Sequence, residues 1–236
     1  LADSFLNEAD KRKHGFVTAK KSDWDDADAD GVPDYKDKIC VISNGMEIKK
    51  SHWAAKDIPI ESVQLIAVAR GEAYKRVDFL AQIAKNAPDH WRITVVTDEK
   101  GRRRLTQSEL WHQVVRKFVI LMNISNGDVL REMAKSHVLI HPSLYEGFCL
   151  PAAEAIANQI PVCFVKGSAV DEVVGPFGAG LSPSDGPDKW VDAIGQTVER
   201  QTSPDFRRDF EHAISNHITW KNAASQLKSL YNSLID

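Results

Sequence analysis

Short runs of β-branched and other apolar residues recur along most of the chain, separated by segments with helical periodicity. Because such nearly continuous apolar strands are buried on both faces, the pattern predicts a parallel sheet with helices on either side. Apolar residues at three- and four-residue spacing predict helices between the strands, as in residues 75–85 and 128–135. The predicted core strands cover residues 63–69, 92–97, 118–122, 137–141 and 161–165.

Both ends of the chain depart from this alternation. The last third is predicted to be helical, and the first part holds two weak strands around an acidic run. The predicted helices cover residues 187–200, 204–216 and 219–234, and the weak strands cover 15–19 and 38–42. We therefore predict an α/β, Rossmann-like fold with a helical C-terminus over residues 46–236, preceded by a different segment in residues 1–45.

The composition excludes several functional classes. With 236 residues, 43% hydrophobic and 27% charged, the chain can bury a sizeable core, which excludes disordered and fibrous proteins. A net charge of -3 gives no general electrostatic footprint for nucleic acid. No stretch approaches the roughly 20 apolar residues of a membrane-spanning helix. Three cysteines among apolar neighbours favour a reduced, cytoplasmic protein, with the cytoplasmic face of a membrane as an alternative.

Two carboxylates lie around the predicted start of one helix. Glu146 follows a predicted strand, Pro151 stands where the first residue of a helix tolerates proline, and Glu154 comes in the predicted first turn. Backbone amides of residues 147–150 would face an anion there. Carboxylates accept hydrogen bonds from sugar diols. The same pair also suits a glycosidase, or a purely structural role in which Glu146 caps a turn and Glu154 interacts favourably with the helix dipole. His141, at the strand end, is more simply explained as structural.

A pair of cations predicted for the same edge of the sheet changes this balance. Arg70 follows the first core strand, and Lys75 opens the next helix. In an open parallel sheet, ligands bind outside the carboxyl ends of the strands, where the turns at 70–75 and 146–151 would meet. A guanidinium and an ammonium can neutralise a diphosphate there, although two cations alone would be explained by a solvated loop. Together the two pairs indicate a nucleoside diphosphate sugar as ligand.

These residues resemble the carboxyl-terminal domain of the retaining glycosyltransferases of family four, which have the GT-B fold. The resemblance covers residues 38–236, with its motifs in the family's order. VISNGME at 41–47 resembles the entry into that domain, and Arg70 with Lys75 resembles its phosphate-binding pair. HPSLYEGFCLPAAEA at 141–155 resembles its E-x7-E signature, and TWKNAASQLKSLY at 219–231 its closing helix. The residues that replace family glycines are Ala69, Arg76, Cys149 and Gln159.

The resemblance implies transfer of a sugar from a nucleoside diphosphate sugar to a glycan, lipid or other acceptor, with retention of anomeric configuration. Arg70 and Lys75 would hold the diphosphate and stabilise it as it leaves. Glu146, the third implied catalytic residue, would hold hydroxyls of the transferred sugar, and Glu154 would hold the ribose. The other implied donor contacts are Gly147, Phe148, Cys149 and Leu150 at the sugar and phosphate, and Met122, Asn123 and Val129 at the base.

The resemblance implies no cofactor and no metal, the nucleotide sugar being a substrate. The acceptor, a glycan or a lipid-linked molecule, would bind through an amino-terminal domain. Residues 1–45 would be the remnant of that domain and a linker. Because the chain starts on Leu1 and holds only one such domain, we expect it to be a fragment that binds donor and is inactive in transfer by itself.

Two other interpretations stay open. A sugar-nucleotide epimerase or hydrolase of related fold suits the same residues, and a non-catalytic nucleotide-sugar or calcium-binding interaction module suits the acidic run. Aspartates in that run follow the spacing of an EF-hand loop, whereas Pro33 and the lack of a strong following helix argue against calcium. The candidate calcium ligands are Asp26, Asp28, Asp30 and Asp37.

Overall fold

The computed structural model of the chain describes residues 15–18, 40–45, 62–203 and 219–235, together with Asp205, Phe206, Arg208 and Phe210. The chain divides into two compact units, residues 1–47 with 216–236 and residues 48–215. The candidate calcium ligands and most of the helix predicted at 204–216 lie outside the described residues. The predicted domain boundary at residue 45 stays a prediction.

The smaller unit contains a two-stranded antiparallel sheet and the last helix. Strand β1 (Gly15–Thr18) pairs with β2 (Cys40–Ser43), and α9 (Trp220–Ile235) lies next to β2. Gly45, after the end of β2, lies very close to the start of α9. A Cβ atom at this glycine would come within 2.3 Å of the Trp220 amide nitrogen. Only glycine therefore fits at this crossing. The two predicted weak strands and the predicted last helix are confirmed.

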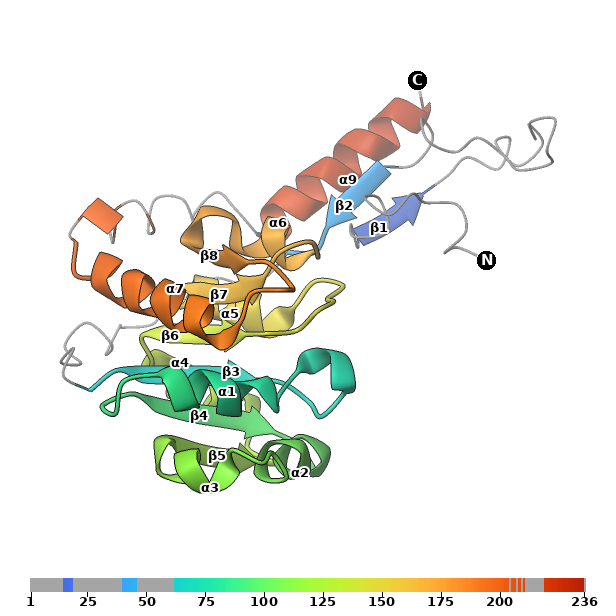
Figure 1. Ribbon diagram of the computed structural model, residues 1–236. Helices are drawn as coiled ribbons and strands as arrows, with labels where there is room; N and C mark the ends of the chain where they lie inside the picture. Colours follow the sequence, from blue (N-terminus) through green and yellow to red (C-terminus); the bar gives the residue numbers. More distant parts are fainter. Residues whose placement is uncertain are drawn as a thin grey trace. The chain divides into compact units, whose positions relative to one another are not determined.

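The larger unit is built on a six-stranded parallel sheet. Its strands are β3 (Gln64–Val68), β4 (Arg92–Thr97), β5 (Phe118–Met122), β6 (Val138–His141), β7 (Val162–Val165) and β8 (Gly178–Leu181). They lie in the order β5-β4-β3-β6-β7-β8, and every neighbouring pair is parallel (Figure 1). The chain thus starts in the middle, runs outward to β5, and returns to the middle at β6. This is the strand order of a Rossmann fold, with its switch point between β3 and β6.

Helices cover both faces of this sheet. Helices α1 (Phe79–Asn86) and α7 (Pro187–Arg200) pack against each other on one face, and α5 (Leu150–Ala157) lies against β6 and β7 on the other (Figure 1). Because all four residues of β7 are buried, the strand needs apolar cover on both sides. The other helices and 3-10 turns are η6 (Ala73–Lys75), α2 (Glu99–Thr106), α3 (Trp111–Val114), η7 (Val115–Lys117), α4 (Asn126–Ala134), α6 (Val170–Val174) and η8 (Gly175–Phe177). The predicted Rossmann-like α/β fold is confirmed.

Strand β8 and the short helices are the elements that the hydrophobic pattern does not predict. The sequence of β8, GAGL, has no β-branched residue and so carries no strand signal. A Cβ atom at Gly178 would lie 2.0 Å from the Val162 carbonyl oxygen, so glycine allows β8 to approach β7. Helices α3 and α6 are too short for a periodicity signal, and α2 is mostly charged. Tertiary packing, rather than local propensity, places these elements.

The helix predicted at residues 75–85 begins later than predicted. Residues Ala73–Lys75 form one 3-10 turn, and Arg76 then adopts a left-handed conformation with φ 52°, which ends the turn. The Arg76 guanidinium lies 4.0 Å from the centre of the Phe79 ring, where α1 begins. Lys75 therefore ends a turn at the edge of the sheet instead of opening a helix.

Three positions with left-handed backbone carry residues other than glycine where the resembling family has glycine. Arg76, Cys149 and Gln159 have φ values of 52°, 67° and 57°. The fourth described non-glycine residue with positive φ is Asn123, at 55°. A side chain in this conformation costs about 1 kcal/mol, because its Cβ atom crowds the backbone. Each of the three residues therefore lowers the stability of the fold, and glycine at the same position would raise it.

Gln159→Gly is expected to raise the free energy of unfolding by about 1 kcal/mol. Gln159 ends α5 in a Schellman motif, in which its amide donates to Ile156 and the Ile160 amide donates to Ala155, both at 2.8 Å. Equilibrium urea denaturation measures the change. Ala157→Gly, inside the same helix, serves as the control and should lower stability by about 1 kcal/mol. Equal losses in both variants would contradict strain at residue 159.

Candidate functional site

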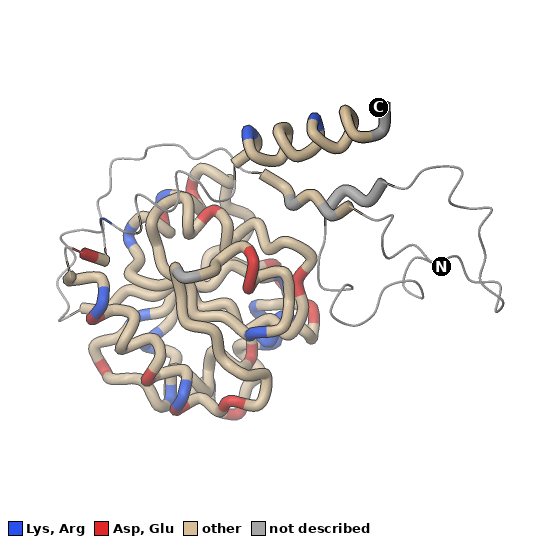
Figure 2. The backbone as a smooth tube through the Cα atoms, turned by 90° about the horizontal axis from the view of Figure 1, so that it is seen from above, with Lys and Arg blue, Asp and Glu red and all other residues tan. Residues whose placement is uncertain are grey.

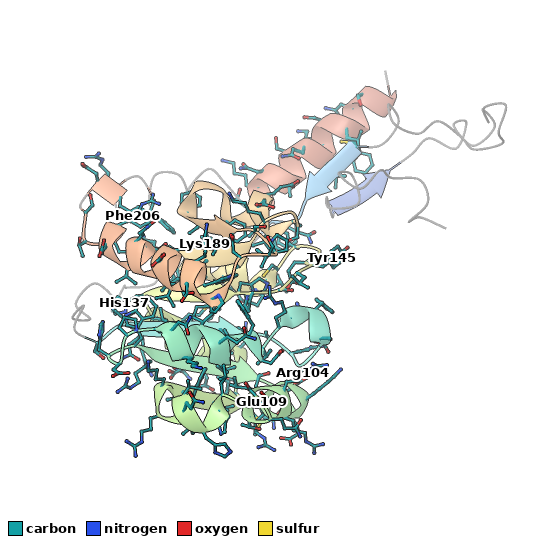
Figure 3. All side chains as sticks on the ribbon, viewed as in Figure 1. Arg104, Glu109, His137, Tyr145, Lys189 and Phe206 are labelled. Atoms are coloured by element: carbon teal, nitrogen blue, oxygen red, sulfur yellow. The ribbon has the colours of Figure 1, made fainter. Side chains whose placement is uncertain are left out.

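The turns that follow β3 and β6 lie side by side at the switch point of the sheet. The Leu144 amide donates a hydrogen bond of 2.8 Å to the Tyr74 carbonyl and so joins the two turns. Figure 3 shows Tyr145 and Arg104 at the end of the sheet where the strands finish, and His137, which precedes β6, at the opposite end. The predicted meeting of the two turns is therefore observed.

The turn after β3 is fixed by the start of α2. Asp98 accepts hydrogen bonds through Oδ1 from the Gly101 amide at 2.8 Å and from the Gly71 amide at 3.0 Å. Arg104 Nε donates to the Gly71 carbonyl at 2.7 Å. A Cβ atom at Gly71 would lie 2.2 Å from the Gly101 nitrogen, so a larger residue would displace backbone. The backbone amide and the backbone carbonyl of Gly71 are thus both hydrogen-bonded within the protein.

The side chains of Lys75 and Glu146 meet across the two turns. Lys75 Nζ lies 2.5 Å from Glu146 Oε1, and His141 Nε2 lies 2.8 Å from the same oxygen. The side chains of Lys75, Glu146 and His141 are 17%, 9% and 2% exposed. One carboxylate oxygen therefore receives two nitrogen donors in a place with little water.

The charges of this cluster depend on one another. Burial alone would raise the pKa of Glu146, but His141 and Lys75 outweigh it and lower the pKa to about 2. Burial alone would lower the pKa of His141, but Cys149 and Glu146 outweigh it and raise the pKa to about 9. At neutral pH the cluster thus holds a carboxylate beside a protonated imidazole. The sequence interpretation of His141 as a structural residue overlooks this contact, since only the turn between the two residues creates it.

Cys149 completes the cluster from the end of the turn. Its Sγ lies 3.3 Å from His141 Nε2, and the residue is 6% exposed. Sγ also lies 3.8 Å from Nδ1, so the ring nitrogen that contacts Glu146 Oε1 is the one nearer to sulfur. A nucleophile–base–carboxylate triad uses two different ring nitrogens. These contacts do not form such a triad.

The sequence predicted Glu154 in the first turn of a helix. In the structure it lies in the second turn of α5. Because Cys149 takes a left-handed conformation, the helix already begins at Leu150, and Pro151 is its second residue. The Glu154 carboxylate is half-buried, and burial raises its pKa more than a hydrogen bond with the Asn126 side chain lowers it. Asn126 is the first residue of α4. Glu154 therefore contacts the segment that the resemblance places near the base.

The remaining predicted residues are distributed along the same edge. Arg70 is exposed and makes no hydrogen bond or ion pair with another described residue. Met122 ends β5 and is 37% exposed, whereas Val129 of α4 is buried. The first amides of α5 have no side-chain cap, so they are available to a ligand or water. Gly147 and Phe148 are half-buried, and Asn123 and Leu150 are exposed. The structure joins Lys75 to Glu146 directly but leaves Arg70 outside that contact.

The surface of the larger unit carries charges of both signs. Figure 2 shows lysine and arginine interspersed with aspartate and glutamate around it. On α2, for example, Glu99 pairs with Arg102 at 2.7 Å and with Arg103 at 2.8 Å. Hydrogen bonds with these arginines lower the pKa of Glu99 to about 2. None of the helices in the described part of the chain is long and apolar enough to cross a lipid bilayer.

Residues 49–217, which contain the whole cluster, match the family described as glycosyl transferases group 1. The chain belongs to this family. It is 28% identical over 194 residues to the MMP α-(1→4)-mannosyltransferase of Mycolicibacterium hassiacum, an alignment that covers 77% of this chain and 42% of the relative. It is 27% identical over 172 residues to O-antigen chain mannosyltransferase B of Escherichia coli, covering 69% and 44%. The chain thus spans less than half the length of these two relatives.

Solved glycosyltransferase structures share the fold of this group 1 chain. A glycosyltransferase from Rickettsia africae superposes with a TM-score of 0.70 and 17% identity, covering 87% of this chain and 59% of that one. HepE from Anabaena, solved in complex with UDP, gives a TM-score of 0.63 and 16% identity, covering 73% and 49%. The predicted carboxyl-terminal domain of a GT-B glycosyltransferase is confirmed as the fold.

Proposed function

We propose that this chain is the donor-binding half of a retaining glycosyltransferase of family four. The observation that carries the proposal is the Lys75–Glu146 pair at the switch point, where open parallel sheets bind their ligands. Membership of a glycosyltransferase family supports sugar transfer. The HepE neighbour was also solved with UDP-glucose, which supports a nucleoside diphosphate sugar as donor. The glycan or lipid-linked acceptor would bind the remainder of the protein, at the cytoplasmic side of a membrane or in the cytoplasm.

The two cations hold the diphosphate in this proposal. Arg70 is exposed and has no described partner, so its guanidinium is available for two parallel hydrogen bonds to phosphate. Lys75 is already placed by Glu146. As the bond to the sugar breaks, negative charge grows on the departing diphosphate, and the two cations stabilise that charge. No cofactor takes part in this step.

The two carboxylates hold hydroxyl groups at either side of the diphosphate. Glu146 positions the transferred sugar, with help from the amides of residues 147–150 at the start of α5. Glu154 accepts hydrogen bonds from the ribose, near Asn126. The base then lies against the end of β5 and the start of α4, at Met122, Asn123 and Val129.

Isothermal titration calorimetry of the chain with UDP, GDP and ADP, and with one sugar of each, tests the proposal. We expect one nucleotide series to bind and the other two to bind much more weakly. Absence of binding by every nucleotide would overturn the donor-domain proposal. For the full-length protein, release of free sugar or an epimer with no dependence on acceptor would favour a hydrolase or epimerase instead.

Glu154→Gln is expected to weaken binding of the preferred nucleotide about tenfold, because hydrogen bonds to a charged acceptor contribute about 1.5 kcal/mol or more. Because the pKa of Glu154 is raised, wild-type affinity for the nucleotide should fall as mild acid protonates this carboxylate, whereas the variant should show no such fall.

The raised pKa of Glu154 in the folded state also affects stability. The free energy of unfolding of the wild type decreases as pH rises through this pKa. The variant should therefore unfold at an equal or higher temperature at neutral pH. Calorimetry and thermal unfolding across pH measure both effects, with Glu199→Gln on α7 as control.

A further inference from the structure

Three different ligand atoms converge at the end of β6. Cys149 Sγ, His141 Nε2 and Glu146 Oε1 all lie within 4.8 Å of one another. Nε2 is 2.8 Å from Oε1 and 3.3 Å from Sγ. The three residues are 6%, 2% and 8% exposed, in the order Cys149, His141, Glu146. Nε2 is the central atom of the set, because Sγ and Oε1 each approach it, and Sγ also lies 3.8 Å from the other ring nitrogen, Nδ1.

We propose that His141, Glu146 and Cys149 form a binding site for Zn²⁺ or a similar divalent cation inside the donor site. Thiolate, imidazole and carboxylate are ligands of zinc, and three protein ligands leave a fourth position open for water. With bonds of about 2.0 Å to nitrogen and oxygen and about 2.3 Å to sulfur, tetrahedral ligands lie about 3.3–3.5 Å apart. The observed Nε2–Sγ separation of 3.3 Å is close to that value, and the Nε2–Oε1 separation of 2.8 Å has to widen. The Cys149 side chain also has to turn toward Nε2, because its sulfur lies 3.8 Å from Nδ1.

Metal binding exchanges protons for the cation. The ion takes the place of the protons that His141 Nε2 and Cys149 Sγ carry, and these protons pass to solvent. Glu146 contributes its charge without losing a proton, because His141 and Lys75 already keep it ionised. Lys75 Nζ lies 2.5 Å from the same carboxylate oxygen, so the ion and the ammonium compete for it. Occupancy by the metal therefore breaks the Lys75–Glu146 pair.

This competition makes the metal an inhibitor of donor binding, a consequence that rests on the proposed function. Lys75 holds the diphosphate and Glu146 holds the sugar in that proposal, and the metal displaces both from their places. A glycine at residue 149 would provide no sulfur ligand, so the sensitivity to metal belongs to the cysteine. The chain thus combines a donor site with a thiolate that admits a zinc-like ion.

Titration of the chain with Co²⁺ tests the metal site, because a thiolate bound to cobalt gives a charge-transfer absorption band. We expect one equivalent to produce the band and Zn²⁺ to abolish it by displacement. The band should vanish in Cys149→Ser and in Cys149→Gly, which relieves the left-handed backbone and so keeps the fold. Cys40→Ala and Cys163→Ala are the controls and should retain it. Absence of the band in the wild type, or its survival in Cys149→Ser, would overturn the site.

The coupling to donor binding is measured separately. Zn²⁺ should weaken the binding of the preferred nucleotide sugar at least tenfold in the wild type and have no effect in Cys149→Gly. Zinc binding with unchanged nucleotide affinity would overturn the coupling. Failure of every nucleotide to bind without metal would instead contradict the proposed function, and the cobalt band would still decide whether the metal site exists.

Discussion

Lys75→Ala is expected to weaken the binding of a nucleoside diphosphate to this chain about 100-fold. Truncating one partner of a buried, hydrogen-bonded charge pair costs about 2–5 kcal/mol, and about 2.8 kcal/mol corresponds to a factor of 100 in Kd. Lys75 is 17% exposed and held by Glu146, so its charge acts on a ligand with little screening by water. The variant should stay folded, because His141 still pairs with Glu146. Calorimetry with the preferred nucleotide measures the loss.

Arg70→Ala and Lys85→Ala separate a phosphate contact from a general effect of charge. Arg70 is exposed at the same edge, so its removal should weaken nucleotide binding about tenfold and leave the unfolding midpoint unchanged. Lys85 is exposed near the end of α1, and its removal should change neither quantity. If Lys75→Ala and Lys85→Ala bound the nucleotide equally well, Lys75 would have no role at the diphosphate.

Glu146→Gln is expected to lower the free energy of unfolding by about 3 kcal/mol. The carboxylate is the shared partner of Lys75 and His141, and all three side chains are mostly buried. A neutral amide leaves the ammonium without its counter-charge and offers it weaker hydrogen bonds. Removing one member of a buried ion pair is costly for this reason, even though such a pair adds little net stability when complete.

Equilibrium denaturation in urea at neutral pH measures this loss. Glu154→Gln is the matched control, because it makes the same chemical change in a half-buried carboxylate that has no described cationic partner. It should cost nothing or stabilise the chain. A loss in Glu146→Gln no larger than that in Glu154→Gln would show that the cluster does not depend on its central charge.

The main elements of the larger unit could be predicted from sequence because their signals are local. Runs such as residues 118–122 combine β-branched and aromatic residues, and β5 (Phe118–Met122) matches that prediction. Strand β8 could not be predicted, since glycines that admit a neighbouring strand look like loop residues until that neighbour is known. The late start of α1 depends on the left-handed conformation of Arg76. Glycine is the residue that usually signals this conformation in a sequence, so an arginine gives no such signal.

The sequence predicted which edge of the sheet carries the candidate site. It predicted fewer of the side-chain contacts within that site. Topology alone brings the turns after β3 and β6 together, so the meeting of Lys75 and Glu146 follows from the fold. The contact of His141 with Cys149 depends on the backbone of residue 149, whose φ of 67° is unusual for a cysteine. The same backbone moves the start of α5 one residue earlier than predicted, so that Glu154 is the fifth residue of the helix and not the fourth.

The engagement of Gly71 by Asp98 determines what kind of phosphate site this chain can have. The Gly71 amide already donates to a carboxylate, so it cannot join a nest of backbone amides around an anion, as a P-loop does. Recognition of phosphate at this turn then falls to the long side chains of Arg70 and Lys75. Arg70 is exposed, so ions in solution compete with phosphate for its charge, and nucleotide affinity in this protein should decline as ionic strength rises.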